Sequence, residues 1–328
     1  MRRHLILCIV CAFVFPRARA EQARTLVVAA DKSGDFVSVQ AAIDSIPANS
    51  AAPTIICIKP GTYKERISVP RGKPHVSFIG EDAATTVLTE GWYSGTLDEN
   101  GKPAGTFKSA STFIFAEDFT AENITFENTF GRIAPNNQAQ ALAIHISGDR
   151  ATFRKCRFLG WQDTVLADAG RHYFEDCFIA GHVDFIFGAA VVWFEKCTIH
   201  CRASGYITAA STPAEQPFGF VFHRCRVTSD DQKPSFLGRP WRSHAAVTWL
   251  NTELCAQIQP AGWDNWSDAS REKTARFAEY QSTGPGANAA RRATWARQLS
   301  DEGAKTITAQ FVLKGTDGWN PANAKDAK

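Results

Sequence analysis

A short apolar motif recurs along the middle of the chain and sets the expected architecture. It reads Phe-x-x-Cys-x-apolar in four segments, FRKCRF (153–158), FEDCFI (174–179), FEKCTI (194–199) and FHRCRV (222–227). Successive cysteines of the motif lie 21, 20 and 28 residues apart. A unit of about twenty residues with short β-prone runs cannot bury its own apolar face, so such units stack and share one continuous core. The pattern therefore predicts a solenoid of short strands.

The repeat favours an all-β, right-handed parallel β-helix over other solenoids. A leucine-rich repeat needs its own Leu and Asn signature, and a propeller blade needs about forty residues. In a β-helix each coil places its Phe and Cys over those of the next coil, at the strand spacing of about 4.8 Å. The cysteines are then interior packing groups. A metal site at Cys197-Thr-Ile-His-Cys201 would need a second pair of ligands, so no metal is expected.

The two ends of the chain carry different patterns from the repeat. Apolar residues between Phe36 and Ile46 recur at helical spacing and stop at Pro47, which predicts a short N-terminal helix that caps the open end of the stack. Residues 54–58 (TIICI) read as the next strand. Strand signals become sparse late in the chain, so we expect the tail from Arg271 onward to wrap the outside and close the other end.

The first residues have the pattern of a secretory signal peptide. The chain begins with two arginines after Met1, continues with the apolar run 5–15 and reaches Ala-Arg-Ala at 18–20. The run is too short to span a membrane. We expect residues 1–20 to be removed, leaving 21–328 as a single exported domain, extracellular or periplasmic, with no membrane attachment.

Charge and cysteine content change once this segment is set aside. The whole chain has a formal net charge of +3, and the first twenty residues contain four arginines and no acids, so the remainder carries −1. A near-neutral chain without a dense basic run lacks the basic patch that nucleic-acid binding requires. Seven of the nine cysteines remain. Their odd number leaves at least one thiol outside any disulfide within the chain.

Two aspartates occupy the same place in successive repeats. Asp163, in GWQDTV, lies seven residues after Cys156, and Asp184, in HVDFIFG, lies seven residues after Cys177. Asp184 is flanked by apolar, β-prone residues, where an unpaired carboxylate is costly to bury. Such a residue is paired with a cation, kept protonated or used in chemistry.

Two amides extend this column of polar residues. Gln162 precedes Asp163, and Gln138 lies 24 residues earlier, about one coil away. Neighbouring carboxylates titrate at different pH values, which provides an acid and a base or nucleophile, while amides can stabilise an oxyanion. Spacing alone leaves open a purely structural ladder of polar side chains. No nucleophile elbow, zinc-protease, phosphate-loop or dinucleotide motif competes with it.

The sequence also resembles a known family along nearly its whole length. The matching segments are GDFVSVQAAID (34–44), KPGTYKE (59–65), NITFENT (123–129), QAQAL (138–142), GWQDT (160–164), HVDFIFG (182–188), LGRPW (237–241), PAGW (260–263) and EYQSTGPGA (279–287). In this order they are similar to the pectin methylesterases, or pectinesterases. The resemblance implies a parallel β-helix that removes methyl esters from the galacturonate of pectin (homogalacturonan), without a cofactor; we expect a monomer.

The resemblance also implies roles for individual residues. It makes Asp184 the nucleophile and Asp163 the general acid/base, with Gln138 and Gln162 stabilising the oxyanion. The remaining expected site residues are the arginine of LGRPW, the sugar-stacking tryptophan, a substrate-contacting threonine and two groove walls: Arg239, Trp241, Thr106, Phe187 and Val183. Gln140 is a departure, because plant members commonly carry Val there.

An arginine is the expected means of distinguishing the two aspartates. Both occupy equivalent places on adjacent coils, so a cation from outside the pair must decide which one ionises. We expect Arg239 to lower the pKa of Asp184 and orient it for attack, and the resulting negative charge to raise the pKa of Asp163.

Two other classes of function remain open at this stage. One is a lyase or glycosidase that cleaves the polysaccharide chain on the same scaffold. A glycosidase would need two carboxylates roughly 5–10 Å apart around a glycosidic bond, and a lyase of this architecture a cluster of calcium-binding acids. The other is a non-catalytic adhesin or carbohydrate-binding module, which would bind sugar and release no product.

The signal-peptide prediction has a direct test. The exported protein should begin near Glu21, because signal peptidase cleaves after the small residues of the Ala-x-Ala pattern. N-terminal sequencing of the exported product checks this, and a product that retains the apolar run 5–15 would contradict it.

Overall fold

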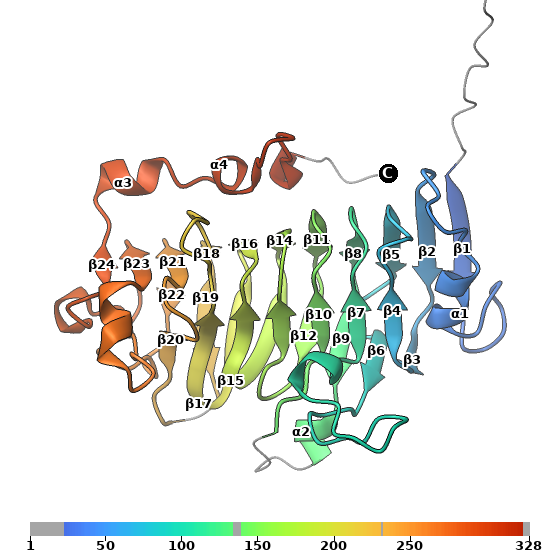
Figure 1. Ribbon diagram of the computed structural model, residues 1–328, viewed down its shortest axis with the longest axis horizontal. Coiled ribbons are helices and arrows are strands. Elements are labelled where there is room, and N and C mark those ends of the chain that lie inside the picture. Colours follow the sequence, from blue (N-terminus) through green and yellow to red (C-terminus); the bar gives the residue numbers. More distant parts are fainter. Residues whose placement is uncertain (1–22, 134–138, 231, 324–328) are drawn as a thin grey trace, which may run out of the picture.

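The chain forms a right-handed parallel β-helix in which successive turns of the coil add strands to three faces. A computed structural model describes residues 23–133, 139–230 and 232–323. Figure 1 shows the strands standing side by side in chain order, from β1 at the N-terminal end to β24 at the other. All of the strand pairs in these ladders are parallel, as the repeat predicted.

The first face is one continuous sheet of eleven strands. In spatial order it contains β1 (Arg24–Val28), β2 (Thr54–Ile58), β5 (Val76–Gly80), β8 (Thr120–Glu122), β11 (Ala151–Arg154), β14 (Arg171–Glu175), β16 (Val191–Glu195), β18 (Phe220–His223), β21 (Ala246–Leu250), β23 (Arg276–Tyr280) and β24 (Arg297–Gln298). The strand predicted at residues 54–58 has those bounds.

The other two faces are joined by two long strands. The second ladder contains β3 (Gly61–Lys64), β6 (Thr86–Glu90), β9 (Thr125–Asn128), β12 (Arg157–Leu159), β15 (Phe178–Gly188), β17 (Thr198–Ala210), β19 (Arg226–Ser229) and β22 (Glu253–Leu254). The third ladder contains β4 (Ile67–Val69), β7 (Thr112–Ile114), β10 (Ile144–Ile146), β13 (Val165–Ala167), the second halves of β15 and β17, and β20 (Phe236–Pro240). Irregular pairing between β15 and β17 near Val183 lets both strands turn the corner.

The repeated phenylalanines form a continuous stack inside the coil. Their ring centroids lie 4.7 Å apart for Phe153 and Phe174, 4.9 Å for Phe174 and Phe194, and 4.4 Å for Phe194 and Phe222. Trp249 continues the stack 3.9 Å beyond Phe222. These separations match the spacing between strands, which confirms the predicted stacking of the repeat.

The repeated cysteines form a second interior column. Cys156, Cys177, Cys197 and Cys225 are all buried. The thiol of each donates to a backbone carbonyl of the preceding coil. All seven cysteines in the part of the chain that the structure describes are free thiols. Within the same residues, no three His, Cys, Asp or Glu side chains gather as metal ligands would.

A short helix covers the N-terminal end of the coil, as predicted. The helix α1 (Val39–Asp44) is shorter than the expected 36–46, because Phe36 forms a β-bridge with Val28 instead. Ser38 caps it by accepting a hydrogen bond from the backbone of Ala41. The helix buries its Val39, Ala42 and Ile43 side chains.

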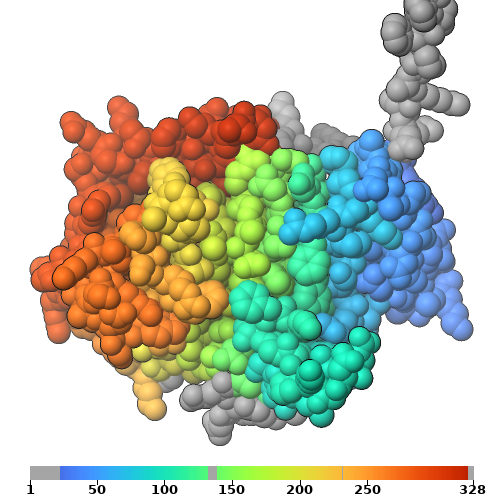
Figure 2. Space-filling model, viewed as in Figure 1, coloured from blue at the N-terminus to red at the C-terminus, as the bar shows by residue number. Residues whose placement is uncertain are grey.

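The C-terminal tail does more than close the far end. Trp295 packs near Phe277 there, with ring centroids 5.7 Å apart. The chain then turns back through α3 (Asp301–Lys305) and α4 (Ala309–Leu313) across the outer face of the first sheet (Figures 1 and 2). The side chain of Leu313 is buried with Tyr173 and Trp193 of that sheet. The expected wrapping of the tail around the outside is confirmed, and the tail contacts the middle of the coil.

The remaining helical segments are short; all lie in loops between strands except η4, which follows α4. They are η1 (Thr106–Lys108), α2 (Phe130–Ile133), η2 (Ala269–Lys273), η3 (Ala289–Arg291) and η4 (Pro321–Asn323). None of the described helices is long and apolar enough to cross a membrane.

Removing one ring from the aromatic stack should be costly. Phe174 is fully buried between two other rings, so Phe174→Ala should lower the free energy of unfolding by about 3–5 kcal/mol through lost burial and an unfilled cavity. Denaturant unfolding measures this. Phe311→Ala is the matched control, because Phe311 is 46% exposed and should cost much less. Equal losses in the two variants would contradict the stacked core.

Candidate active site

The two equivalent aspartates meet in a pocket of about 240 Å³ on the third ladder. Its lining combines acids, amides, an arginine and aromatic rings: Thr106, Phe107, Gln140, Gln162, Asp163, Asp184, Phe187, Ala209, Arg239, Trp241 and Trp266. Seven of the nine residues proposed from the sequence therefore come together. Val183 does not line this pocket, and Gln138 lies outside the described residues.

The coil places the two aspartates in register, as the repeat predicted. Val165 of β13 pairs with Ile186 of β15, and each lies two residues after one of the aspartates. The backbone N–H of Asp163 donates to the carbonyl of Val183 over 3.0 Å. Val183 thus contributes through its backbone to the contact between the two coils.

Both aspartates have a backbone conformation that side-chain-bearing residues rarely adopt. The φ angles are 65° for Asp163 and 51° for Asp184, in the left-handed region that costs roughly 1–2 kcal/mol per residue. Strain of this kind persists only where the surrounding structure imposes it. Turns elsewhere in the coil, such as those at Lys155, Asp176 and Lys196, also have positive φ, so this conformation belongs to the repeat and places the two aspartates at equivalent turns.

Arg239 forms a two-pronged ion pair with Asp184. Its Nε donates to Oδ1 over 2.9 Å and its Nη2 donates to Oδ2 over 2.7 Å. Arg239 reaches this position from β20, where it pairs with Ala209 of β17, and Ala209 in turn pairs with Phe187 of β15. Parallel hydrogen bonds from a planar guanidinium fix both the charge and the orientation of the carboxylate.

Two aromatic rings hold the guanidinium of Arg239 itself. The Cζ atom of Arg239 lies 3.7 Å from the ring centroid of Tyr206 and 3.7 Å from that of Trp266. Cation–π contacts of this kind are strongest where water is excluded. Because its neighbours fix the arginine, it can hold Asp184 in one orientation.

The two carboxyl groups have different proton affinities. Burial raises the pKa of Asp163 well above its ordinary value, the charge of Asp184 raises it further, and Arg239 opposes both. Burial also raises the pKa of Asp184, although the hydrogen bonds and charge of Arg239 pull it down. Arg239 lowers the pKa of Asp184 as expected, but burial outweighs it and the net shift is upward. The expected rise at Asp163 holds.

The amides of the pocket come from neighbouring coils. Gln162 lines the pocket beside Asp163. Gln140, noted only as a departure from the family pattern, also lines it and accepts a hydrogen bond from the Ser94 hydroxyl at Oε1 over 2.9 Å. With Oε1 engaged, the NH2 group of Gln140 is the donor that its amide offers to a ligand.

Aromatic side chains surround the acids. Phe187 is buried and meets Trp241 edge to face, with centroids 5.8 Å apart. Phe107 is 46% exposed and lies 6.4 Å from Trp241. Phe187 is therefore part of the floor, while Phe107 and Trp241 are the groups available to a ligand. Apolar faces flanked by polar groups suit a sugar ring.

Sequence reasoning missed Tyr206, Trp266 and Phe107. Tyr206 lies in the long strand β17, which interrupts the Phe-x-x-Cys spacing, and Trp266 lies in a loop with a positive φ of 60°. Neither position belongs to the repeat. The chemistry of Arg239 could have pointed to these rings. A partly buried guanidinium donates hydrogen bonds in its own plane and stacks its flat faces on aromatic rings.

Comparisons with known proteins identify the family of the chain. A family model described as Pectinesterase matches residues 25–316. The chain is 42% identical to Pectinesterase 31 of Arabidopsis thaliana over 285 residues, which cover 85% of this chain and 89% of the relative. Its fold matches that of the pectin methylesterase from carrot with a TM-score of 0.82 and 32% identity, covering 89% and 93% of the two chains. A pectin methylesterase solved in complex with a hexasaccharide matches with a TM-score of 0.78 and 31% identity, covering 90% and 98%.

The raised pKa of Asp163 has a consequence for stability. In the unfolded chain this group titrates near its ordinary pKa of about 3.9. Above that pH the folded state binds more protons than the unfolded state, so folding loses stability as the pH rises through the window up to the folded pKa. Asp163→Asn removes this penalty. The variant should therefore gain stability relative to the parent between about pH 4 and neutrality, as measured by denaturant unfolding.

Asp317 provides a control of opposite sign. Its hydrogen bond from Arg171 holds its pKa below the ordinary value, so it stabilises the fold above about pH 4 and loses that effect as the pH falls. Asp317→Asn should therefore be less stable than the parent at neutral pH and similar to it in strong acid. Parallel pH trends in the two variants would contradict the assigned environments.

Proposed function

The chain belongs to the pectinesterase family of enzymes, and from that premise we propose that it hydrolyses the methyl esters of pectin to pectate and methanol. The observation that supports this most strongly is the ion pair between Arg239 and Asp184 beside the buried Asp163. It provides a fixed carboxylate and a proton donor in one pocket of a size suited to a single sugar unit.

Asp184 acts as the nucleophile in this proposal. Arg239 offsets the cost of burying its negative charge and holds both oxygens in place. One carboxylate oxygen attacks the carbonyl carbon of the methyl ester and forms a tetrahedral intermediate. A covalent acyl-enzyme, an anhydride between Asp184 and the galacturonate, follows when the intermediate collapses.

The negative oxygen of that intermediate needs hydrogen-bond donors. Gln162 offers its amide NH2 from the pocket wall, and the family pattern assigns the same task to Gln138. Fixed donors aimed at the developing charge lower the barrier without reorganising during the reaction. Gln140 adds a further amide in the pocket, where it contributes to ester binding.

Asp163 acts first as the general acid and then as the general base. Its raised pKa keeps it protonated at the start, so it can donate to the departing methoxide, and methanol leaves. The resulting carboxylate takes a proton from water, whose oxygen attacks the acyl carbonyl. The bond to Asp184 then breaks, and the free Asp184 carboxylate and protonated Asp163 are restored. One ester and one water thus give one acid and one methanol.

The aromatic residues position the polymer. Trp241 and Phe107 are available to the faces of the bound sugar, and Thr106 lines the same pocket. We also infer that the enzyme acts outside the cytoplasm, since residues 1–20 have the signal-peptide pattern and the substrate is a polymer too large to enter by diffusion.

The competing functions predict different products. The proposed enzyme should release methanol from highly esterified pectin and leave the chain length unchanged, because the reaction breaks only the ester bond. Addition of a chelator should not alter the rate. Methanol assay combined with size-exclusion chromatography of the polymer tests this. Shortened chains or new unsaturated ends would favour the glycosidase or lyase, and binding without methanol the adhesin.

A further inference from the structure

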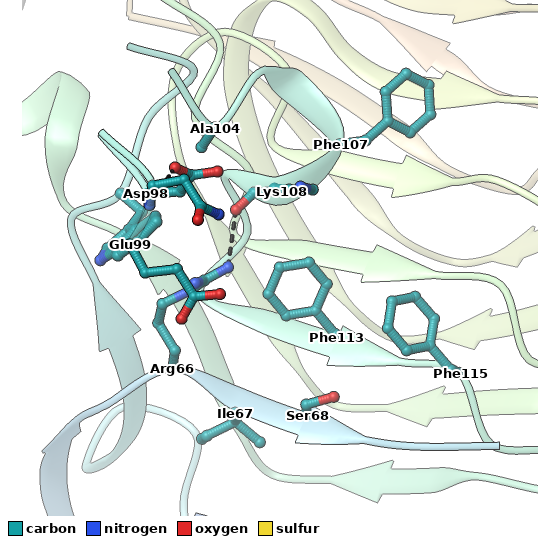
Figure 3. A pocket seen from close by; sticks show the side chains of 12 residues that line it. Arg66, Ile67, Ser68, Asp98, Glu99, Ala104, Phe107, Lys108, Phe113 and Phe115 are labelled. Atoms are coloured by element: carbon teal, nitrogen blue, oxygen red, sulfur yellow. Dashed lines mark hydrogen bonds between the residues drawn. The ribbon is translucent and has the colours of Figure 1, made fainter. Parts of the chain in front are cut away.

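The turn that carries Thr106 and Phe107 into the catalytic pocket is attached to the coil through its backbone. Both residues belong to η1 and line the pocket. The carbonyl of Lys108, in the same turn, accepts a hydrogen bond from Arg66 Nη2 over 2.8 Å, and the carbonyl of Phe107 faces Nδ1 of His145 over 3.2 Å. Figure 3 shows the first of these contacts and the side chain of Phe107 on the same loop. The position of η1 therefore depends on groups outside the catalytic pocket.

His145 lies in the middle of β10, between β7 and β13 of the third ladder. Its side chain is buried. The rings of Phe107, Phe113 and Phe115 surround the imidazole, with centroids between 5.3 and 6.1 Å from its own. On the other side Nε2 faces Oδ2 of Asp168 over 3.3 Å. Since the rings keep water away from the imidazole, its two nitrogens depend on these protein oxygens for their hydrogen bonds.

Both nitrogens of His145 face atoms that can only accept hydrogen bonds. A backbone carbonyl and an ionised carboxylate carry no donor, so both contacts are satisfied only when the imidazole is protonated on both nitrogens. A neutral imidazole has a single N–H. The charge of Asp168 makes it the stronger acceptor of the two, so the remaining proton stays on Nε2. Nδ1 then turns a lone pair towards the oxygen of Phe107, and the contact that holds η1 is lost.

Charged groups around His145 come from three elements. Asp168 follows β13, Lys108 belongs to η1, and Arg66 precedes β4, with its Cζ 5.1 Å from the ring centroid of Phe113. The strand β10 contributes no other titratable residue. The side chain of Lys108 is exposed, where water and salt screen its charge, and Arg66 is directed at the Lys108 carbonyl. Asp168 is therefore the charge that acts on the imidazole through a hydrogen bond.

We propose that His145 is a positioning residue, which latches η1 onto the coil when it is protonated and releases the turn when it is neutral. The inference rests on the proposed function and adds pH control to it. Histidine changes charge between about pH 5 and 8. At the acidic end of that range Phe107 is held beside Trp241, 6.4 Å away. At the other end only the contact with Arg66 remains, so the wall of the pocket is less ordered and KM for the polymer rises.

His145→Leu tests the latch, because it removes both ring nitrogens and leaves an apolar side chain among the phenylalanines. KM for methanol release from highly esterified pectin is measured at about pH 5 and about pH 8. In the parent it should be about tenfold higher at the higher pH, since a hydrogen bond to a charged group is lost. The variant should show the high KM at both values, with kcat equal to that of the parent at each pH.

Asp168→Asn should have the opposite effect. The new amide can donate to Nε2 of the neutral imidazole, so the single N–H moves to Nδ1 and continues to hold the carbonyl of Phe107. KM should then stay low at both pH values. The side chain of Asp168 is 39% exposed, so the fold tolerates this change. A KM that rises with pH in Asp168→Asn as it does in the parent, or a rise that persists in His145→Leu, would overturn the proposal.

His200→Leu is the matched control. His200 also contacts a carboxylate, with Nε2 2.9 Å from Oδ2 of Asp230, but its Nδ1 lies 2.8 Å from the hydroxyl of Thr228. A hydroxyl can donate or accept, so this imidazole is satisfied in either protonation state. It lies on β17 and outside the catalytic pocket. The variant should keep the pH dependence of the parent, and a loss of that dependence would assign the effect to histidines in general.

Hydrogen exchange separates the latch from the esterase activity. The backbone amides of Lys108 and Ser109 donate to carbonyls of the same loop over 3.3 and 3.1 Å, so their exchange reports the opening of η1. At about pH 5, exchange should be about tenfold faster in His145→Leu than in the parent, and at about pH 8 about tenfold slower in Asp168→Asn. This result is expected even if the parent releases no methanol, which would refute the proposed function alone. Equal exchange in the three proteins would refute the latch.

Discussion

The paired hydrogen bonds from Arg239 to Asp184 are the interaction on which the site depends. Without a cation, a carboxylate that is only 6% exposed would be protonated or would destabilise the fold. With the guanidinium 2.7 and 2.9 Å away, its charge and orientation are both maintained. Tyr206 and Trp266 then fix the arginine from its two faces. The geometry of the ion pair therefore depends on the residues packed around it, and the strands of the coil hold those residues in place.

The coil supplies two equivalent positions, and the arginine makes them different. Register places Asp163 and Asp184 at matching turns of adjacent strands, both with positive φ. A perfect repeat would give two identical acids. Arg239 arrives from β20, two strands beyond β15, where it lies in register with Ala209 of β17 and Phe187 of β15. Asp163, without such a partner, keeps its proton.

The sequence predicted the features that repeat and the site residues that carry family motifs, such as Arg239 and Trp241. The spacing of Phe and Cys predicted the stack, and the equal distance from Cys156 to Asp163 and from Cys177 to Asp184 predicted the column of acids. Features that neither repeat nor carry a family motif were missed, including the rings on either side of Arg239 and the packing of the tail on Tyr173. Each depends on contacts between segments far apart in the chain. The sign of the pKa shift at Asp184 was missed because burial cannot be weighed against an ion pair from spacing alone.

Mapping of the covalent intermediate tests the central claim most directly. Asp163→Asn should still form the acyl-enzyme from an ester with a better leaving group than methanol, but should hydrolyse it slowly because no group takes a proton from water. Mass spectrometry of the quenched variant should then locate the adduct on Asp184, and Asp184→Asn should form none. An adduct on Asp163 in the Asp184→Asn protein would show that the two roles are reversed.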